Sequence, residues 1–268
     1  MRERLVAALR AKGSVVVGFS GGVDSALLAK LAADTLGERA LAVIVDSESY
    51  APEEKDAAIA FARELGIPHE VVWHSELADP SYVANPTDRC YFCRQGLSDV
   101  LFRLARERGF AAVAVGTNLD DARDAFRPGD KALRERGAWQ PFVELGMGKA
   151  DVRALARELG LPVADKPSMA CLSSRIPYGE PIDITKLTRI GRAEAAVRAL
   201  GFRQVRVRTF GGTQARVETD EPARAASLAA DIERLLAPLG YASVEIDPRG
   251  YRTGAMNETL RVLNHSGQ

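Results

Sequence analysis

A run of six residues between a strand-like and a helix-like segment, S-G-G-V-D-S, most constrains how this chain folds. Its members are Ser20, Gly21, Gly22, Val23, Asp24 and Ser25. The apolar run 15–17 precedes it, and a segment with helical spacing begins at Ala26. Adjacent glycines let the main chain approach an anion, and the N–H groups that open a helix carry a partial positive charge. The run therefore predicts a phosphate-binding turn, although the G-x-x-x-x-G-K-[S/T] spacing of the other common phosphate loop is absent.

The composition is that of a globular chain without a net charge. The 268 residues are 46% hydrophobic and 27% charged, with 36 basic and 36 acidic side chains. This length is enough for a sizeable core in one large domain or in two unequal ones. Because the charges balance, nucleic acid is disfavoured as a main partner, although local basic patches remain open. The first ten residues alternate charges and no run reaches membrane-spanning length, so we expect a cytoplasmic protein without a membrane partner.

The first half of the chain alternates β-rich runs with helical patterns, which predicts an α/β fold with a doubly wound parallel sheet. The expected strands are 14–19, 40–45, 69–73 and 111–115, and the expected helices are 26–36, 52–65 and 88–108. Binding sites of such sheets lie at the carboxyl ends of the strands. Ser20, Asp46, His74 and Gly116 share that edge on this register.

A smaller α+β domain is expected after residues 179–181, where the pattern changes. The segment 117–140 before it is polar and charged, and a helix over 149–159 leads into a proline-containing loop. The later segments predict a helix over 184–200, strands over 204–209 and 214–218, a helix over 222–237 and a strand over 242–246. Asp220 is expected to cap the second of these helices, with Pro222 in its first turn. We therefore predict two domains, 1–180 and 181–268.

Cys90 and Cys93 stand in the sequence R-C-Y-F-C-R, near the start of the expected helix 88–108. A spacing of three places both thiols on one helical face, and the positive end of the helix favours the thiolate that binds metal or attacks an electrophile. A C-x-x-C pair alone is a weak signal. A thioredoxin-like pair would follow the first strand of its fold, where the phosphate-binding turn stands here. Three cysteines in all disfavour a disulfide framework and favour metal or thiol chemistry.

Cys171, the third cysteine, lies in a loop with proline on both sides. Arg175 and Lys166 flank it, and such cations favour the thiolate and hold a phosphate or a carboxylate. These are the needs of a nucleophile that acts on an adenylate. The alternative is a small buried hydrophobic residue, the usual role of a single cysteine in an apolar setting.

Four segments together give the chain a specific resemblance. They are S-G-G-V-D-S (20–25), R-C-Y-F-C-R (89–94), G-T-N-L-D-D-A-R-D-A-F-R-P-G (116–129) and K-P-S-M-A-C-L-S-S-R-I-P-Y-G (166–179). The first resembles the loop of the PP-loop ATP pyrophosphatases, which cleave ATP between the α and β phosphates. The set, in this order over the whole chain, resembles the LarE family. Its members are ATP-dependent sulfur transferases of nickel-pincer nucleotide synthesis, the cofactor route of lactate racemase.

The resemblance implies a reaction on a small molecule, pyridinium-3,5-biscarboxylic acid mononucleotide. ATP with Mg²⁺ adenylates a carboxylate of this substrate, and sulfur then displaces AMP to give a thiocarboxylate. In one mode of the family, a single cysteine at the position of Cys171 gives up its own sulfur. In the other, three cysteines hold a [4Fe-4S] cluster that carries an extra sulfide. Three thiolates leave one iron open, so with Cys90, Cys93 and Cys171 we expect the cluster and a sulfide or other sulfur donor.

Further residues of the nucleotide site follow from the resemblance and from their places in the fold. Asp24 is expected to hold Mg²⁺ between the β and γ phosphates, or to cap the following helix. Ser47 would face the adenine or the ribose, and Gly116 and Thr117 would approach the nucleotide. A polar loop that covers the nucleotide is expected to carry Asp120, Asp121, Arg123 and Asp124. Solvated charges are the alternative for at least two of those four.

The expected second domain offers a substrate site. Arg206 and Arg208 alternate on a strand, so both guanidinium groups point to one side. They form either a phosphate clamp for the mononucleotide or a solvated surface. Glu194 and Glu218 are candidates for substrate or metal contacts. The turn 209–213 lacks the histidine that family members more often carry.

Three other functions remain open on sequence alone. A PP-loop synthetase that uses ammonia would share the phosphate-binding turn and need no cysteine. A tRNA-thiolating enzyme would also use cysteines, but it normally carries a basic RNA-binding extension, which the balanced charge does not suggest. An ATP-binding iron or redox sensor has no evident use for Asp24 and the second serine. The resemblance favours the transferase, acting as a symmetric homo-oligomer.

Overall fold

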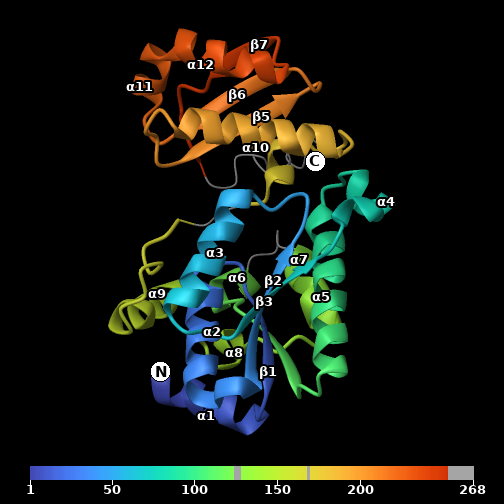
Figure 1. Ribbon diagram of the computed structural model, residues 1–268, viewed down its shortest axis with the longest axis vertical. Helices are drawn as coiled ribbons and strands as arrows, with labels where there is room; N and C mark the ends of the chain where they lie inside the picture. The colour runs from blue at the N-terminus through green and yellow to red at the C-terminus, as the bar shows by residue number, and fades with distance from the viewer. Residues whose placement is uncertain (124–127, 168–169, 253–268) are drawn as a thin grey trace, which may run out of the picture. The chain divides into compact units, whose positions relative to one another are not determined.

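The computed structural model describes residues 1–123, 128–167 and 170–252, and the chain divides into two compact units (Figure 1). Unit 1 comprises Met1–Tyr82 and Thr87–Met169. Unit 2 comprises Val83–Pro86 and Ala170–Gln268. The division into folding domains at residues 180 and 181 stays a prediction.

Unit 1 is built on a parallel sheet of four strands in the order β3-β2-β1-β4. The strands are β1 (Val15–Gly18), β2 (Ala40–Asp46), β3 (His69–Trp73) and β4 (Ala112–Val115). β1 pairs with β2 on one side and with β4 on the other. The chain therefore changes its winding direction between β1 and β4, which is where ligands of open α/β sheets bind. This arrangement confirms the predicted doubly wound parallel sheet.

Helices cover both faces of this sheet (Figure 1). Val15 and Val17 of β1 face a core shared with α1, α2, α3 and α9, whereas Val16 faces Leu101 and Leu104 of α5. The alternation follows from the two-residue period of a strand. The longer helices of the unit are α1 (Arg2–Lys12), α2 (Val23–Leu36), α3 (Pro52–Glu64), α5 (Arg89–Glu107), α7 (Pro128–Glu135) and α9 (Lys149–Glu158). The short ones are η1 (Gly37–Arg39), η2 (Glu76–Ala78), α6 (Leu119–Arg123) and α8 (Pro141–Glu144), with α4 (Pro80–Val83) at the border of the unit.

Unit 2 is an α+β unit with a three-stranded sheet in the order β5-β6-β7. Its strands are β5 (Val205–Phe210), β6 (Gln214–Thr219) and β7 (Ser243–Ile246); β5 and β6 are antiparallel, and β6 and β7 are parallel. Its helices are η3 (Leu172–Arg175), α10 (Ile184–Arg198), α11 (Pro222–Ser227), α12 (Ala229–Leu236) and η4 (Ala237–Leu239). Val197 of α10, Val207, Val217 and Ile232 form its core. Asp183 caps α10 by accepting a hydrogen bond from the Lys186 main-chain N–H at 2.7 Å.

Two local predictions for unit 2 were wrong. The helix expected over 222–237 is interrupted at Leu228, whose N–H donates to the carbonyls of both Arg224 and Ala225, so α11 ends in a tight turn before α12. Asp220 does not cap α11, because Glu221 holds that position and the Asp220 carboxylate instead accepts from the Gln204 N–H at 3.2 Å. Across the described ranges, no helix is both long enough and apolar enough to cross a bilayer.

Candidate functional site

The predicted phosphate-binding turn lies at the carboxyl end of β1. Helix α2 begins at Val23 with Gly22 as its N-cap, three residues earlier than the sequence predicted, so Asp24 and Ser25 lie in the first helical turn. Gly21 has a φ of +67°, and a Cβ at this position would lie 2.8 Å from the Cβ of Ala58. Only glycine meets both demands. The turn thus presents main-chain N–H groups at a helix start, as an anion site requires.

The two serines of the turn have different surroundings. Ser25 is buried, and its hydroxyl accepts from the Ser20 N–H at 3.1 Å while donating to the Gly22 carbonyl at 3.1 Å. Ser20, in contrast, is exposed, and its hydroxyl oxygen lies 3.2 Å from the hydroxyl oxygen of Ser25. Tyr50 donates its hydroxyl proton to the Ser20 carbonyl at 3.1 Å. Ser25 therefore shapes the turn, and Ser20 remains accessible to a ligand.

The end of β4 packs directly on the start of α2. A Cβ on Gly116 would lie 2.8 Å from the carbonyl carbon of Asp24 and 2.8 Å from the nitrogen of Ser25. Thr117 follows and is half-buried. The structure thus brings Gly116 and Thr117 beside the phosphate-binding turn, as their places at the strand ends predicted.

A polar network around Asp24 contains two residues that sequence reasoning missed. The amide nitrogen of buried Asn118 donates to Asp24 at 3.1 Å and to Asp121 at 2.8 Å. Lys149, the first residue of α9, forms an ion pair with the other oxygen of Asp24. The position of Asn118 just past the fourth strand was the one available signal. The sequence around Lys149 has no local pattern that predicts its contact with Asp24, which lies 125 positions earlier in the chain.

The polar segment after β4 is not a plain loop, because residues 119–123 form the short helix α6. The Asp120 carboxylate accepts a hydrogen bond from the main-chain N–H of Lys149 at 2.6 Å. Arg123 is exposed at the end of α6. Asp124 lies outside the described residues.

Ser47, just past β2, faces a second acidic group. Its hydroxyl donates to the Glu76 carboxylate at 3.1 Å. Glu76 is buried and also accepts from the Tyr82 hydroxyl at 3.1 Å. Asp46, the last residue of β2, pairs with Lys55 at 2.8 Å. The strand end near Ser47 is therefore polar and held by side-chain contacts.

The three cysteines are divided between the units, and none is disulfide-bonded. Cys90 is exposed and Cys93 half-buried in the first turns of α5. Cys171 is half-buried and precedes η3 in unit 2. Within the described parts of the chain, no three His, Cys, Asp or Glu side chains are grouped as metal ligands.

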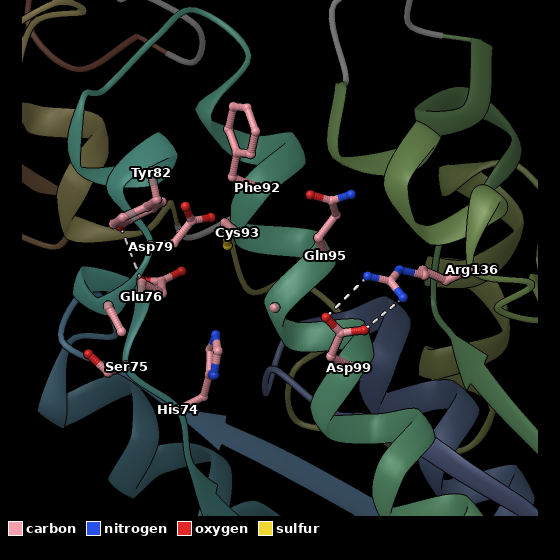
Figure 2. A pocket seen from close by; sticks show the side chains of 12 residues that line it. His74, Ser75, Glu76, Asp79, Tyr82, Phe92, Cys93, Gln95, Asp99 and Arg136 are labelled. Atoms are coloured by element: carbon pink, nitrogen blue, oxygen red, sulfur yellow. Dashed lines mark hydrogen bonds and ion pairs between the residues drawn. The ribbon is translucent and has the colours of Figure 1, made fainter.

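Cys93 lines a cavity of about 290 Å³ in unit 1, at the end of β3 and the start of α5 (Figure 2). His74 enters the same cavity, beside Gly96, which lies one turn after Cys93. A Cβ on Gly96 would be 2.3 Å from the His74 Nε2 atom. The glycine therefore makes the room that the imidazole occupies. The other lining residues are Ser75, Glu76, Ala78, Asp79, Tyr82, Phe92, Gln95, Asp99 and Arg136.

In unit 2, Arg175 ties Cys171 to a buried ion pair. Its guanidinium donates to Glu194 at 2.6 and 3.0 Å and to the carbonyls of Ala170 and Cys171 at 2.9 and 3.1 Å. Burial acts to lower the pKa of Arg175, but the charge and hydrogen bonds of Glu194 raise it above the ordinary value, so the group stays cationic. Lys166, expected beside Cys171, instead pairs with Glu54 at 2.7 Å in unit 1.

Arg206 and Arg208 extend this buried cluster, so the alternative of a solvated surface was wrong. Arg208 donates to Glu218 at 2.5 and 3.1 Å. Arg206 donates to the Tyr251 hydroxyl at 2.9 Å and lies 4.4 Å from the centre of its ring. Burial first, and then the nearby charges of Arg175 and Arg208, lower the pKa of Arg206.

The described cluster thus holds the buried guanidinium groups of Arg175, Arg206 and Arg208 against the carboxylates of Glu194 and Glu218, and the partly exposed Arg198 also lies 3.8 Å from Glu194. The sequence suggested Glu194 and Glu218 as candidates for substrate or metal contacts. In the structure, each of these carboxylates forms an ion pair with an arginine. Arg206 forms no ion pair with a carboxylate of the described residues, and guanidinium groups suit a phosphate.

Comparisons with known proteins place this chain among ATP-using enzymes. A family described as NAD synthase matches residues 3–82. The chain is 44% identical over 250 residues to an uncharacterised protein of Synechocystis sp., covering 91% of this chain and 92% of that protein. It is 30% identical over 220 residues to a tRNA-specific 2-thiouridylase of Azorhizobium caulinodans, covering 68% of this chain and 55% of that protein.

A third relative matches nearly the whole chain. It is the pyridinium-3,5-bisthiocarboxylic acid mononucleotide synthase of Lactiplantibacillus plantarum, 39% identical over 262 residues, with 97% of this chain and 94% of that protein covered. The phosphate-binding turn of unit 1 and the cysteine-bearing segments thus occur in a chain that belongs to the LarE family of PP-loop enzymes.

Proposed function

We propose that this chain is an ATP-dependent sulfur transferase that converts a carboxylate of pyridinium-3,5-biscarboxylic acid mononucleotide to a thiocarboxylate. The product belongs to nickel-pincer nucleotide synthesis, with lactate racemase as the final client. The observation that carries the proposal is the buried arginine cluster, in which Arg175 holds the main chain of Cys171 while Arg206 forms no ion pair with a carboxylate of the described residues. A sulfur-bearing group beside an anion site is what such a transfer needs.

Unit 1 supplies the nucleotide site in this proposal. The triphosphate lies on the turn formed by Ser20, Gly21, Gly22, Val23 and Ser25, where main-chain N–H groups open α2. Asp24 and the adjacent Asp121 provide the carboxylate oxygens that Mg²⁺ prefers. Gly116 and Thr117 line the turn from β4, Ser47 faces the adenine or ribose, and Arg123 covers the phosphates.

The reaction has two balanced steps. A substrate carboxylate oxygen attacks the α phosphorus of ATP, the bond to the bridging oxygen breaks, and pyrophosphate leaves with its electron pair. A sulfide sulfur then attacks the acyl carbon of the adenylate, and AMP leaves. Arg206 and Arg208 hold the 5′-phosphate of the mononucleotide, while Glu194 and Glu218 keep Arg175 and Arg208 in place.

We further propose that Cys90, Cys93 and Cys171 hold a [4Fe-4S] cluster. The donor set fits the group, because thiolates are the ligands of such clusters and two of the three lie in the first turns of one helix. When bound, the cluster supplies an open iron to which a sulfide can be added. A small sulfur donor replenishes that sulfide, and the enzyme works as a homo-oligomer in the cytoplasm.

The test is the iron and acid-labile sulfide content of protein purified without oxygen, for the wild type and for C171A and C90A. We expect about four irons per wild-type chain and loss of iron in both variants. Iron-free wild type that forms one thiocarboxylate, while losing one sulfur atom from Cys171, would overturn the cluster and leave the transferase in its sacrificial form. A C171A variant that keeps full activity would refute the sulfur transferase function and favour a PP-loop synthetase instead.

A further inference from the structure

The carboxylates of Asp24 and Asp121 are drawn together by one amide group. The Asn118 nitrogen donates to both, and the Asn118 oxygen accepts from the N–H groups of Asp120 at 3.0 Å and Asp121 at 3.1 Å. Asn118 is only 1% exposed, so its amide is fixed. Two carboxylates held at one nitrogen repel each other, and a nearby cation offsets this repulsion. In this structure Lys149 supplies such a charge to Asp24, with which it forms an ion pair.

The main chain of Lys149 is fixed by the start of α9. Its N–H donates to Asp120 at 2.6 Å, and the N–H of the preceding Gly148 donates to Asp151 at 2.9 Å. A Cβ on Gly148 would be 3.1 Å from the Asp120 carboxylate, so this approach is close. The ammonium group, in contrast, stands on a flexible four-carbon stem, and the side chain is 31% exposed.

The position of Lys149 is electrostatically unusual. A cation in the first turn of a helix faces the positive end of the helix dipole and is disfavoured there. Asp24 offsets this cost and lies at the N-terminal turn of α2, where an anion is favoured. The pair therefore places one positive charge on the carboxylate that the ATP site needs for its metal ion.

We propose that Lys149 holds the place of the divalent cation on Asp24 while no nucleotide is bound, and that it transfers to the phosphates when Mg·ATP arrives. The inference rests on the proposed use of ATP. The Asp24 carboxylate that Lys149 leaves, with Asp121 beside it, would then be available to hold Mg²⁺. The released ammonium group then lies next to the phosphate-binding turn, where it neutralises charge on the leaving pyrophosphate. Lys149 is thus a binding residue of the reaction and keeps the metal from binding before the nucleotide.

Mn²⁺ binding to nucleotide-free protein tests this role without any turnover. Electron paramagnetic resonance titration of the full chain with Mn²⁺ should give weak binding for the wild type and for K149R. K149M and K149Q should each gain one site, bound about tenfold more tightly or better, because the competing charge is gone. The double variant D24N/K149M should lose the gained site. K30M is the matched control, since Lys30 pairs with Asp34 elsewhere on α2 and should leave Mn²⁺ binding unchanged.

With substrate and Mg·ATP, K149M should release pyrophosphate at least about tenfold more slowly, while K149R retains most of the rate. Unchanged Mn²⁺ affinity in folded K149M and K149Q would overturn the inference, as would a gain that survives D24N. If the wild type forms no AMP from ATP but K149M gains Mn²⁺, the proposed function fails and the cation role of Lys149 stands.

Discussion

Arg175 and Glu194 form a two-point ion pair, with hydrogen bonds of 2.6 and 3.0 Å between side chains that are each about 2% exposed. The Glu194 oxygen at 2.6 Å also accepts from the Val207 N–H at 3.0 Å. One carboxylate therefore joins η3, α10 and β5. Because Arg175 also holds the Cys171 carbonyl, this pair sets the main chain around the thiol.

E194Q should destabilise the protein strongly. The substitution keeps the shape but leaves Arg175 buried without its counter-charge, which costs about 3–5 kcal/mol when one partner of a buried pair is removed. Urea unfolding monitored by circular dichroism measures the loss. E245Q is the control, because Glu245 pairs with Arg216 at the surface and should cost less than about 1 kcal/mol. Equal losses in the two variants would refute the structural importance of the buried pair.

G116A should weaken ATP binding and lower stability by about 1–3 kcal/mol, the usual cost of overpacking. The added methyl group would meet main-chain atoms of Asp24 and Ser25 at 2.8 Å, and main chain cannot move aside as a side chain can. Calorimetric titration with Mg·ATP measures the affinity. In G191A the new Cβ lies 3.4 Å from Leu172, an ordinary contact, so ATP binding should stay unchanged. Normal ATP affinity in G116A would place the nucleotide elsewhere.

Tyr50 should make stability fall at high pH. Burial, followed by the charges of Glu54 and Asp46, raises the pKa of the Tyr50 hydroxyl above its ordinary value near 10. At pH values between the pKa of Tyr50 in the unfolded state and its pKa in the folded state, the folded state binds more protons. The contribution of Tyr50 to the unfolding free energy is therefore full below about pH 10 and is lost as the pH rises further. Unfolding free energies of wild type and Y50F at about pH 8 and pH 11 measure it. Y50F should lose less on going to high pH, and identical pH dependence in both proteins would contradict this.

G96A should destabilise unit 1 through His74. The new Cβ would lie 2.3 Å from the imidazole Nε2 atom, so the ring must leave its place in the cavity beside Cys93 (Figure 2). We expect a loss of about 1–3 kcal/mol in thermal or urea unfolding. H74A/G96A tests the cause, because removal of the ring should make the second substitution nearly neutral. Additive losses in the double variant would show that the conflict lies elsewhere on α5.

Much of the fold was predictable because local sequence and tertiary packing agree. Val15 to Val17 are β-branched and lie in β1, and the expected strand 69–73 coincides with β3. The strand ends then placed Ser20 and Gly116 at one edge of the sheet. Their proximity follows from the parallel pairing of β1 with β4.

Other features depended on contacts between distant segments. Lys149 reaches Asp24, and Lys166 reaches Glu54, through packing of α9 and the following loop that no local pattern encodes. The burial of Arg206 could not be predicted from the sequence, because alternating arginines are equally typical of a solvent-exposed strand. The roles of the three cysteines stay predictions, since thiol spacing fixes Cys90 relative to Cys93 but not to the third cysteine.

Product analysis by mass spectrometry would show whether this protein transfers sulfur to the mononucleotide. Anaerobically prepared protein would be incubated with pyridinium-3,5-biscarboxylic acid mononucleotide, Mg·ATP and sulfide, with AMP and pyrophosphate counted in parallel. We expect exchange of one carboxylate oxygen for sulfur per AMP formed, and none in C171A. ATP cleavage without sulfur in the product, or full thiocarboxylate formation by C171A, would refute sulfur transfer through Cys171.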